Sequence, residues 1–134
     1  TGAGPDHNGT SAVQSHMTNS RLTDPEILEQ RFPVLLDYFR LRANSGGDGK
    51  FHGGNGVERC IRFNQPVQVS ILSNRRRTEP FGLAGGNAGN SGENWYIDPE
   101  GKKQSLPACT AFDLPAGGSV LIRTPGGGGY GSAE

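Results

Sequence analysis

The sequence predicts a mainly β domain, either an antiparallel sandwich or a partly open barrel, with one short N-terminal helix and glycine-rich loops. Short apolar segments, several of them with a period of two, are separated by turn residues. Glycine accounts for 22 of the 134 residues and only 32% are hydrophobic, which predicts a thin core and many loops. This length suits a single domain.

We divide the chain into a polar, glycine-rich arm over residues 1–20 and one mainly β domain over residues 21–134. The arm has no apolar periodicity, so we expect it to pack on neighbouring structure. A short helix should begin at Pro25, which suits the first helical position, with Asp24 as its N-cap. Pro33 should end this helix after about two turns.

Apolar segments bounded by turn residues predict the strands. We expect strands at residues 34–41, 57–63, 67–71, 95–97, 111–114 and 119–123. The first of these segments is also compatible with a short helix. The three-residue connection at 64–66 would allow the strands on either side of it to pair with each other in an antiparallel hairpin.

The segment 57–63 has an interrupted alternation. Val57, Ile61 and Phe63 alternate with polar residues, as in a strand that is buried on one face. Arg59 falls in the apolar row and breaks it.

Charge and composition exclude several classes of partner. Thirteen basic side chains balance thirteen acidic ones, so no overall field favours nucleic acid or an anionic membrane. No apolar run is long enough to span a bilayer. Cys60 and Cys109 are too far apart for a CxxC site, which suggests reduced, structural thiols in a cytoplasmic protein. The chain begins at Thr1 rather than methionine, which suggests a segment of something larger.

Three consecutive arginines follow the predicted strand 67–71. Neighbouring residues of an extended chain point to opposite faces, so at least one of Arg75, Arg76 and Arg77 should turn towards a partner. A guanidinium can hold a carboxylate or phosphate with two hydrogen bonds, which would suit an acidic substrate. The alternative is a solvated strand end paired with Glu79.

The tail contains four consecutive glycines at Gly126, Gly127, Gly128 and Gly129. They could line an anion with backbone N–H groups, allow a neighbouring chain to approach closely, or form a flexible end. A dinucleotide-binding fingerprint is not expected, because no helix can follow before the chain ends. A phosphate loop is not expected either, because Gly49-Lys50 is followed by Phe51, where this motif requires Ser or Thr.

His16 and Asn19 belong to a cluster of small polar residues that could contact a substrate or move a proton. A surface histidine is the alternative interpretation of His16. The histidines His7, His16 and His52 lack zinc-ligand spacing, so we expect no metal site within the chain, although a site shared with another domain is left open.

Several motifs occur in one order along the chain: residues 16–21, 23–26, 31–35, 45–56, 75–76, 82–86 and 124–131. With these motifs the sequence resembles the C-terminal end of the hydantoinase B / 5-oxoprolinase family over nearly its whole length. The forms at residues 24–29 and 126–131 are most similar to the eukaryotic-type 5-oxoprolinase branch, in which hydantoinase A-like and B-like parts share one chain.

The resemblance implies ATP-dependent opening of a cyclic amide, 5-oxo-L-proline, to L-glutamate. It implies that ATP and Mg²⁺ bind outside this segment, that no cofactor binds within it, and that the segment is inactive alone. The implied partners are the remaining A-like and B-like regions, a small-molecule substrate and a second copy of the parent chain.

On this resemblance, Arg75 or Arg76 would contact an anion, His16 and Asn19 would act as catalytic polar contacts, and residues 126–129 would shape the site. Two alternatives stay open: a structural or oligomerisation module, and a related hydantoinase or ATP-dependent carboxylase acting on another cyclic amide or a ketone.

Overall fold

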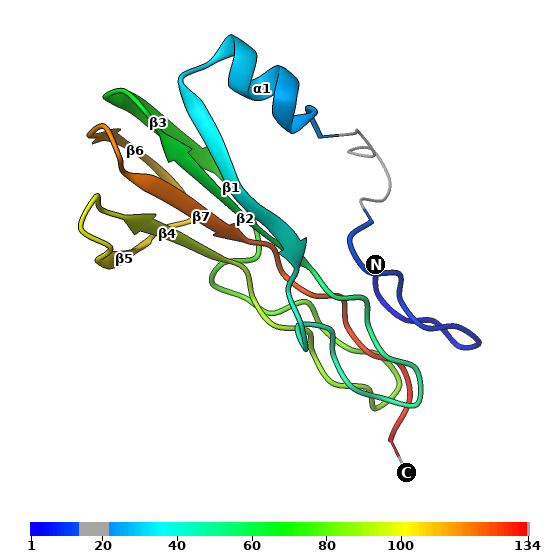
Figure 1. Cartoon of the computed structure of the whole chain (residues 1–134). Coiled ribbons are helices and arrows are strands. Elements are labelled where there is room, and N and C mark those ends of the chain that lie inside the picture. Colours follow the sequence, from blue (N-terminus) through cyan, green and yellow to red (C-terminus); the bar gives the residue numbers. More distant parts are fainter. Residues whose placement is uncertain (14–21, 134) are drawn as a thin grey trace.

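Two antiparallel β-sheets pack face to face in the computed structural model, which describes residues 1–13 and 22–133 (Figure 1). These residues form one helix and seven strands. In chain order the elements are α1 (Pro25–Arg31), β1 (Val34–Leu41), β2 (Val57–Phe63), β3 (Val67–Leu72), β4 (Glu93–Ile97), β5 (Lys103–Leu106), β6 (Cys109–Leu114) and β7 (Ser119–Arg123). The predicted mainly β fold with one short helix is confirmed.

Helix α1 begins and ends where the sequence predicts. The Asp24 carboxylate accepts a hydrogen bond of 2.9 Å from the Glu26 backbone N–H, and Pro25 occupies the first turn. The Phe32 N–H donates to the Leu28 carbonyl, and the chain then becomes extended. No residue of α1 is buried, so local capping rather than core packing defines its ends.

The larger sheet has the strand order β1-β2-β7-β4-β5, and the smaller sheet consists of β3 and β6. The predicted pairing of segments 57–63 and 67–71 is wrong. Both edges of β2 are occupied, by β1 on one side and β7 on the other, so the chain crosses to the second sheet and β3 pairs with β6. Over the described residues the sheets do not close into a barrel, so the sandwich is the correct alternative.

Strand β5 is a strand that the sequence did not predict. Its four residues, Lys103 to Leu106, contain one apolar side chain and no alternation of hydrophobicity. It forms because it follows a tight turn after β4 and pairs with that strand over four residues. Tertiary pairing therefore supplies a strand where local pattern gave no signal.

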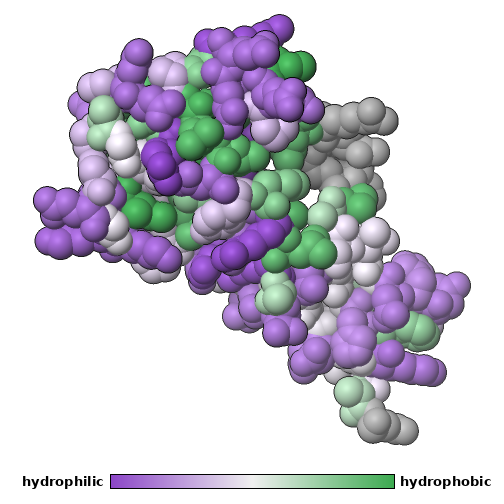
Figure 2. Space-filling model, in the orientation of Figure 1, coloured by the Kyte–Doolittle hydropathy of each residue, from purple (hydrophilic) through white to green (hydrophobic). Residues whose placement is uncertain are grey.

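The hydrophobic core lies between the sheets. Ile71 and Leu114 of the small sheet pack with Val120 of β7, and the rings of Tyr96 and Phe112 meet edge to face with centroids 5.9 Å apart. Figure 2 shows hydrophobic residues gathered on the sandwich, whereas the extension below it is mainly hydrophilic or neutral. Burial of this apolar surface is the main force that holds the two sheets together.

A glycine-rich extension runs away from the sandwich, and in Figure 1 its segments lie side by side. Residues 45–56, 80–92 and 124–131 are extended, and backbone hydrogen bonds join one segment to the next. Glycines recur at intervals of three, the residue period of a polyproline II helix. A Cβ atom at Gly126 would collide with the carbonyl oxygen of Ser45, so glycine is required for this close approach.

Residues 1–13 pack on this extension. The N-terminal amine donates to the Thr10 carbonyl at 2.7 Å, the Gly54 N–H donates to the Thr1 carbonyl, and the Ala3 N–H donates to Gly128. The boundary that we predict near residue 20 lies within residues 14–21, outside the described part of the chain, and stays a prediction.

Candidate functional site

Both predicted catalytic residues, His16 and Asn19, lie outside the described residues. Their roles stay predictions. The remaining predicted site residues belong to the arginine turn after β3 and to the glycine tail, and both are described.

The arginine turn separates its three side chains into different surroundings. Arg75 is exposed and has a positive φ of 55°, and Arg77 is exposed as well. Arg76 turns inward, where its Nε donates to Asn94 Oδ1 at 3.1 Å and its Nη1 donates to the Asn74 carbonyl. Across the two described stretches, no ion pair joins these arginines to Glu79.

Asn94 fixes the inward position of Arg76. Its side chain is 1% exposed, and its Nδ2 donates to Ser73 Oγ at 2.9 Å and to the Pro107 carbonyl at 3.3 Å. Burial, followed by the charge of Arg42, lowers the pKa of the Arg76 guanidinium. The side chain of Arg76 thus ties the turn to β4, and its predicted role in anion binding stays a prediction.

Arg42 connects this region to the start of the glycine tail. Its Nη1 donates to the carbonyls of Ser91 at 2.7 Å and Thr124 at 3.0 Å, and its Nη2 lies 3.5 Å from Glu93 Oε1. The arginine turn and the tail are therefore neighbours at the junction of the sandwich and the extension.

The N–H groups of the glycine tail are largely occupied. Gly126 donates to Asn90 at 3.1 Å, Gly127 to Gly54 at 2.8 Å and Gly129 to Asn87 at 2.9 Å, each time to a backbone carbonyl. In this arrangement these three N–H groups are not available to an anion, and the tail instead accommodates closely packed backbone. The predicted anion-binding role of residues 126–129 stays a prediction.

A row of alternating charges crosses the outer face of the large sheet, and the sequence did not predict it. The register places Arg40, Glu58, Arg123 and Glu93 opposite one another on four neighbouring strands. Arg40 Nε lies 2.7 Å from Glu58 Oε2, and Arg123 lies 3.0 Å from Glu58 Oε1 and 3.2 Å from Glu93 Oε2. We call these four residues the charge row. Only the strand order reveals it, because the residues are distant in sequence.

Hydrogen bonding tunes the charge at one end of the charge row. The Trp95 indole N–H donates to Glu93 Oε2 at 3.0 Å, and this bond, with the neighbouring Arg123 and Arg42, lowers the pKa of the Glu93 carboxyl. Glu93 is therefore a stable anion at neutral pH, and it joins two arginines and an indole.

Both cysteines are free thiols in the described structure, Cys60 buried and Cys109 exposed. Burial, and then the nearby Asp37 carboxylate, raise the pKa of the Cys60 thiol. A neutral buried thiol is a poor nucleophile, which supports the structural role that we expect for Cys60.

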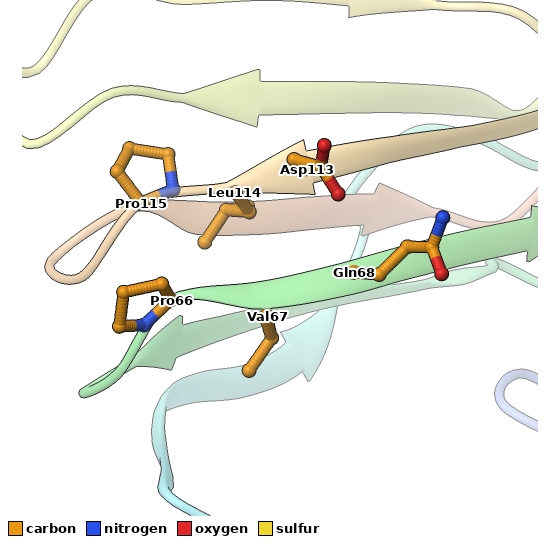
Figure 3. Close-up of a pocket in the computed structure, with 6 residues that line it drawn as sticks. All are labelled: Pro66, Val67, Gln68, Asp113, Leu114 and Pro115. Carbon is orange, nitrogen blue, oxygen red and sulfur yellow. The ribbon is translucent and has the colours of Figure 1, made fainter.

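Two open cavities lie away from the predicted site residues. One, of about 490 Å³, lies at the end of the small sheet, where Figure 3 shows Pro66, Val67, Leu114 and Pro115 together. The other, of about 550 Å³, lies on the outer face of the large sheet beside Cys60.

Within residues 1–13 and 22–133, no group of three or more His, Cys, Asp or Glu side chains could hold a metal ion. No helix of those residues is long and apolar enough to cross a membrane.

Known structures share this fold. A nucleotide-free acetone carboxylase superposes with a TM-score of 0.74 over 93% of this chain and 21% of that chain, at 20% sequence identity. The ATP-dependent caprolactamase of Pseudomonas jessenii superposes with a TM-score of 0.67 over 81% of this chain and 20% of that chain, at 24% identity. At these identities the similarity shows the fold alone.

Sequence relatives are much closer. The 5-oxoprolinase 1 of Arabidopsis thaliana is 54% identical over 131 residues, which cover 98% of this chain and 10% of that protein. The 5-oxoprolinase of Dictyostelium discoideum is 48% identical over 134 residues, which cover 100% of this chain and 11% of that protein. The chain thus spans about a tenth of the length of these relatives. The model of the Hydantoinase B/oxoprolinase family matches residues 1–133, and the chain belongs to this family.

Proposed function

We propose that this chain is the C-terminal segment of an ATP-dependent 5-oxoprolinase, which opens 5-oxo-L-proline to L-glutamate. The 54% identity with a plant 5-oxoprolinase over 98% of the chain carries this proposal. Because the matched region is about a tenth of that relative, the segment alone is not expected to turn over substrate. The parent protein would be a cytoplasmic homodimer.

ATP and Mg²⁺ would bind in the parent protein outside this segment. Two observations on the segment support this: it contains no phosphate-loop motif, and three N–H groups of its glycine tail already bind backbone carbonyls. ATP would supply a phosphoryl group that activates the amide carbonyl. The residues of this chain would bind, orient and exchange protons with the activated substrate.

Within this role we assign Arg75 to contact an anionic group of the substrate, because it is exposed beside the ordered Arg76. Arg76 would act mainly as a positioning residue through Asn94, with a direct anion contact as its predicted alternative. His16 and Asn19 would supply polar contact or proton transfer. Residues 126–129 would shape the backbone beside the arginine turn.

The test uses the complete polypeptide that carries this sequence, assayed for ATP-dependent formation of glutamate from 5-oxo-L-proline. Loss of a charged hydrogen bond should lower kcat/KM roughly tenfold to a hundredfold in Arg75→Ala. His16→Ala should lower kcat more than it raises KM. The matched control is Arg77→Ala, an exposed neighbour, which should retain turnover.

The outcomes separate the activity from the site. Normal turnover in both Arg75→Ala and His16→Ala would reject the site assignment and leave the activity standing. Turnover of another cyclic amide or a ketone, but not of 5-oxo-L-proline, would favour a related hydantoinase or carboxylase.

The second candidate is a structural or oligomerisation module. One observation favours it: the glycine N–H groups and the Arg76 guanidinium already make hydrogen bonds within the chain. Light scattering on the complete polypeptide, with and without this segment, checks it. A change from dimer to monomer with unchanged substrate binding would support this module, and lost substrate binding in an unchanged dimer would reject it.

A further inference from the structure

The inner face of the large sheet is only partly covered. Five strands face a partner sheet of two, and in Figure 1 β3 lies on the side of β1 while β6 lies towards β4. Phe112 of β6 contacts Tyr96 of β4, so the small sheet covers the β7-β4 region. On the inner side of β1, Val34 at the start of the strand is buried, whereas Phe39 and Leu41 towards its end are exposed.

The exposed part of the inner face is defined by the strand register. Phe39 lies opposite Arg59, which lies opposite Ile122 of the core, and Leu41 lies opposite Val57. Opposite residues of an antiparallel pair point to the same side, so these side chains share the inner face. We call Phe39, Leu41, Val57 and Arg59 the β1–β2 face. Phe39 is 47% exposed and Leu41 is 54% exposed, although both belong to the side that forms the core.

Arg59 gives this apolar face a specific chemical requirement. Its side chain is half-buried between Phe39 and Ile122, and among residues 1–13 and 22–133 it makes no hydrogen bond or ion pair. Burial lowers the pKa of its guanidinium. Further covering of an unpaired charge is unfavourable, so whatever covers this face must bring an acceptor.

We infer that the β1–β2 face receives an apolar segment of the longer polypeptide, from outside residues 1–134, which covers Phe39 and Leu41 and brings an Asp or Glu carboxylate to Arg59. This inference rests on the proposed function, in which the chain is a part of a longer protein. The matched relatives are about ten times as long as this chain, so most of their residues lie outside the matched region and could supply such a segment. A guanidinium pairs best with a carboxylate, in two parallel hydrogen bonds.

Two further observations favour a polypeptide over a small carboxylate. Neither of the two cavities described above is lined by a residue of the β1–β2 face. Among the described residues β3 pairs only with β6, so its other edge can accept an added strand. A strand added there would extend the small sheet over β1.

Cysteine labelling in the complete polypeptide, without ATP or substrate, tests whether the face is covered. The variants are Phe39→Cys on the face and Ser70→Cys on the outer side of the small sheet as the control. The maleimide labelling rate of each introduced cysteine is divided by the rate for the same cysteine in urea. Peptide mass mapping identifies which cysteine has been labelled. Phe39→Cys should label roughly tenfold or more slowly after this correction, because labelling requires local opening. Labelling as fast as in urea would overturn the inference.

Chemical cross-linking identifies the occupant. In Arg59→Lys, a carbodiimide activates the partner carboxylate as an O-acylisourea. The amine introduced at position 59 attacks the activated carbonyl, forms an amide and releases the carbodiimide as a urea. An amide to an Asp or Glu outside residues 1–134 of the same polypeptide supports the inference. No amide, an amide only within residues 1–134, or an amide between isotopically distinct copies overturns it.

The readout is independent of catalysis. A protected Phe39→Cys and the expected amide in a polypeptide that does not turn over 5-oxo-L-proline would reject the proposed function alone. An active polypeptide with a fully reactive Phe39→Cys would reject this inference alone.

Discussion

Asn94 is the residue at which the arginine turn, β4 and the connection before β6 meet. Its amide binds Arg76, Ser73 and Pro107, and it is almost completely buried. Each of these groups would lose a partner inside the protein if the amide were removed. A single side chain therefore holds three segments together at this junction through its hydrogen bonds.

We expect Asn94→Ala to lower the free energy of unfolding by about 2–3 kcal/mol, because buried polar groups are left without partners. Urea titration followed by far-ultraviolet circular dichroism measures this. The control is Asn90→Ala, whose exposed amide makes one hydrogen bond to the Asn44 carbonyl. Equal urea midpoints for the two variants would contradict the proposed importance of Asn94.

The sequence predicts that one arginine of the turn should find a partner, and Arg76 does so. It does not predict the partner, because Asn94 lies 18 residues away and reaches Arg76 only after β4 has joined the sheet. The distance in sequence, rather than the chemistry of either side chain, is what hides the contact.

At the scale of elements, the charge row shows how strand order creates an electrostatic arrangement. The pKa of Glu93 is lowered in the folded state, so its contribution to stability is present above the unfolded value of about 4.3. This contribution is lost as the pH falls through the folded pKa. The ion pairs are partly exposed, so solvent screens them.

We therefore expect Glu93→Gln to lose less free energy of unfolding between pH 6 and pH 3 than the unsubstituted chain does. Urea titrations at several pH values check this. Glu100→Gln, in the exposed turn after β4, is the matched control and should show the same pH dependence as the unsubstituted chain. If Glu93→Gln and Glu100→Gln behave alike, Glu93 does not contribute to acid sensitivity.

The glycine-rich extension is stabilised by close contact between backbones rather than by side-chain packing. At Gly53 an added Cβ would collide with the carbonyl oxygen of Gly127, whereas at Gly2 the nearest atom, the Gly128 carbonyl oxygen, would be 3.6 Å away. The two glycines thus provide a matched pair, Gly53 in the extension and Gly2 in residues 1–13, which pack on it.

We expect Gly53→Ala to reduce the free energy of unfolding by about 1–3 kcal/mol through steric conflict. Gly2→Ala should have an effect within about 0.5 kcal/mol. Thermal unfolding of both variants measures the difference. A destabilisation by Gly2→Ala as large as that by Gly53→Ala would show that close packing is not the cause.

At the scale of the whole molecule, stability depends on the contact between two sheets of unequal size. Leu114 is 1% exposed at the centre of this contact, and Leu72, on the neighbouring strand of the small sheet, is 90% exposed. The same residue type therefore occurs in the core and on the surface of one small sheet.

We expect Leu114→Ala to cost about 2–5 kcal/mol, because it leaves a cavity between the sheets. Leu72→Ala should change the free energy of unfolding by no more than about 0.5 kcal/mol. Differential scanning calorimetry of the two variants compares them directly. Similar melting temperatures would mean that the sheets are not held by this core.

Local sequence determined the helix and its cap, most of the strands, the glycine-rich character of the extension and, through its ordered motifs, the family. Tertiary structure alone decided that β3 pairs with β6, that Lys103 to Leu106 form a strand, that the charges form a row and that Arg59 shares a face with Phe39. The physical reason is that capping and periodicity act between near neighbours. Strand order and register instead bring together residues that are far apart in the chain, and local pattern contains no information about such pairs.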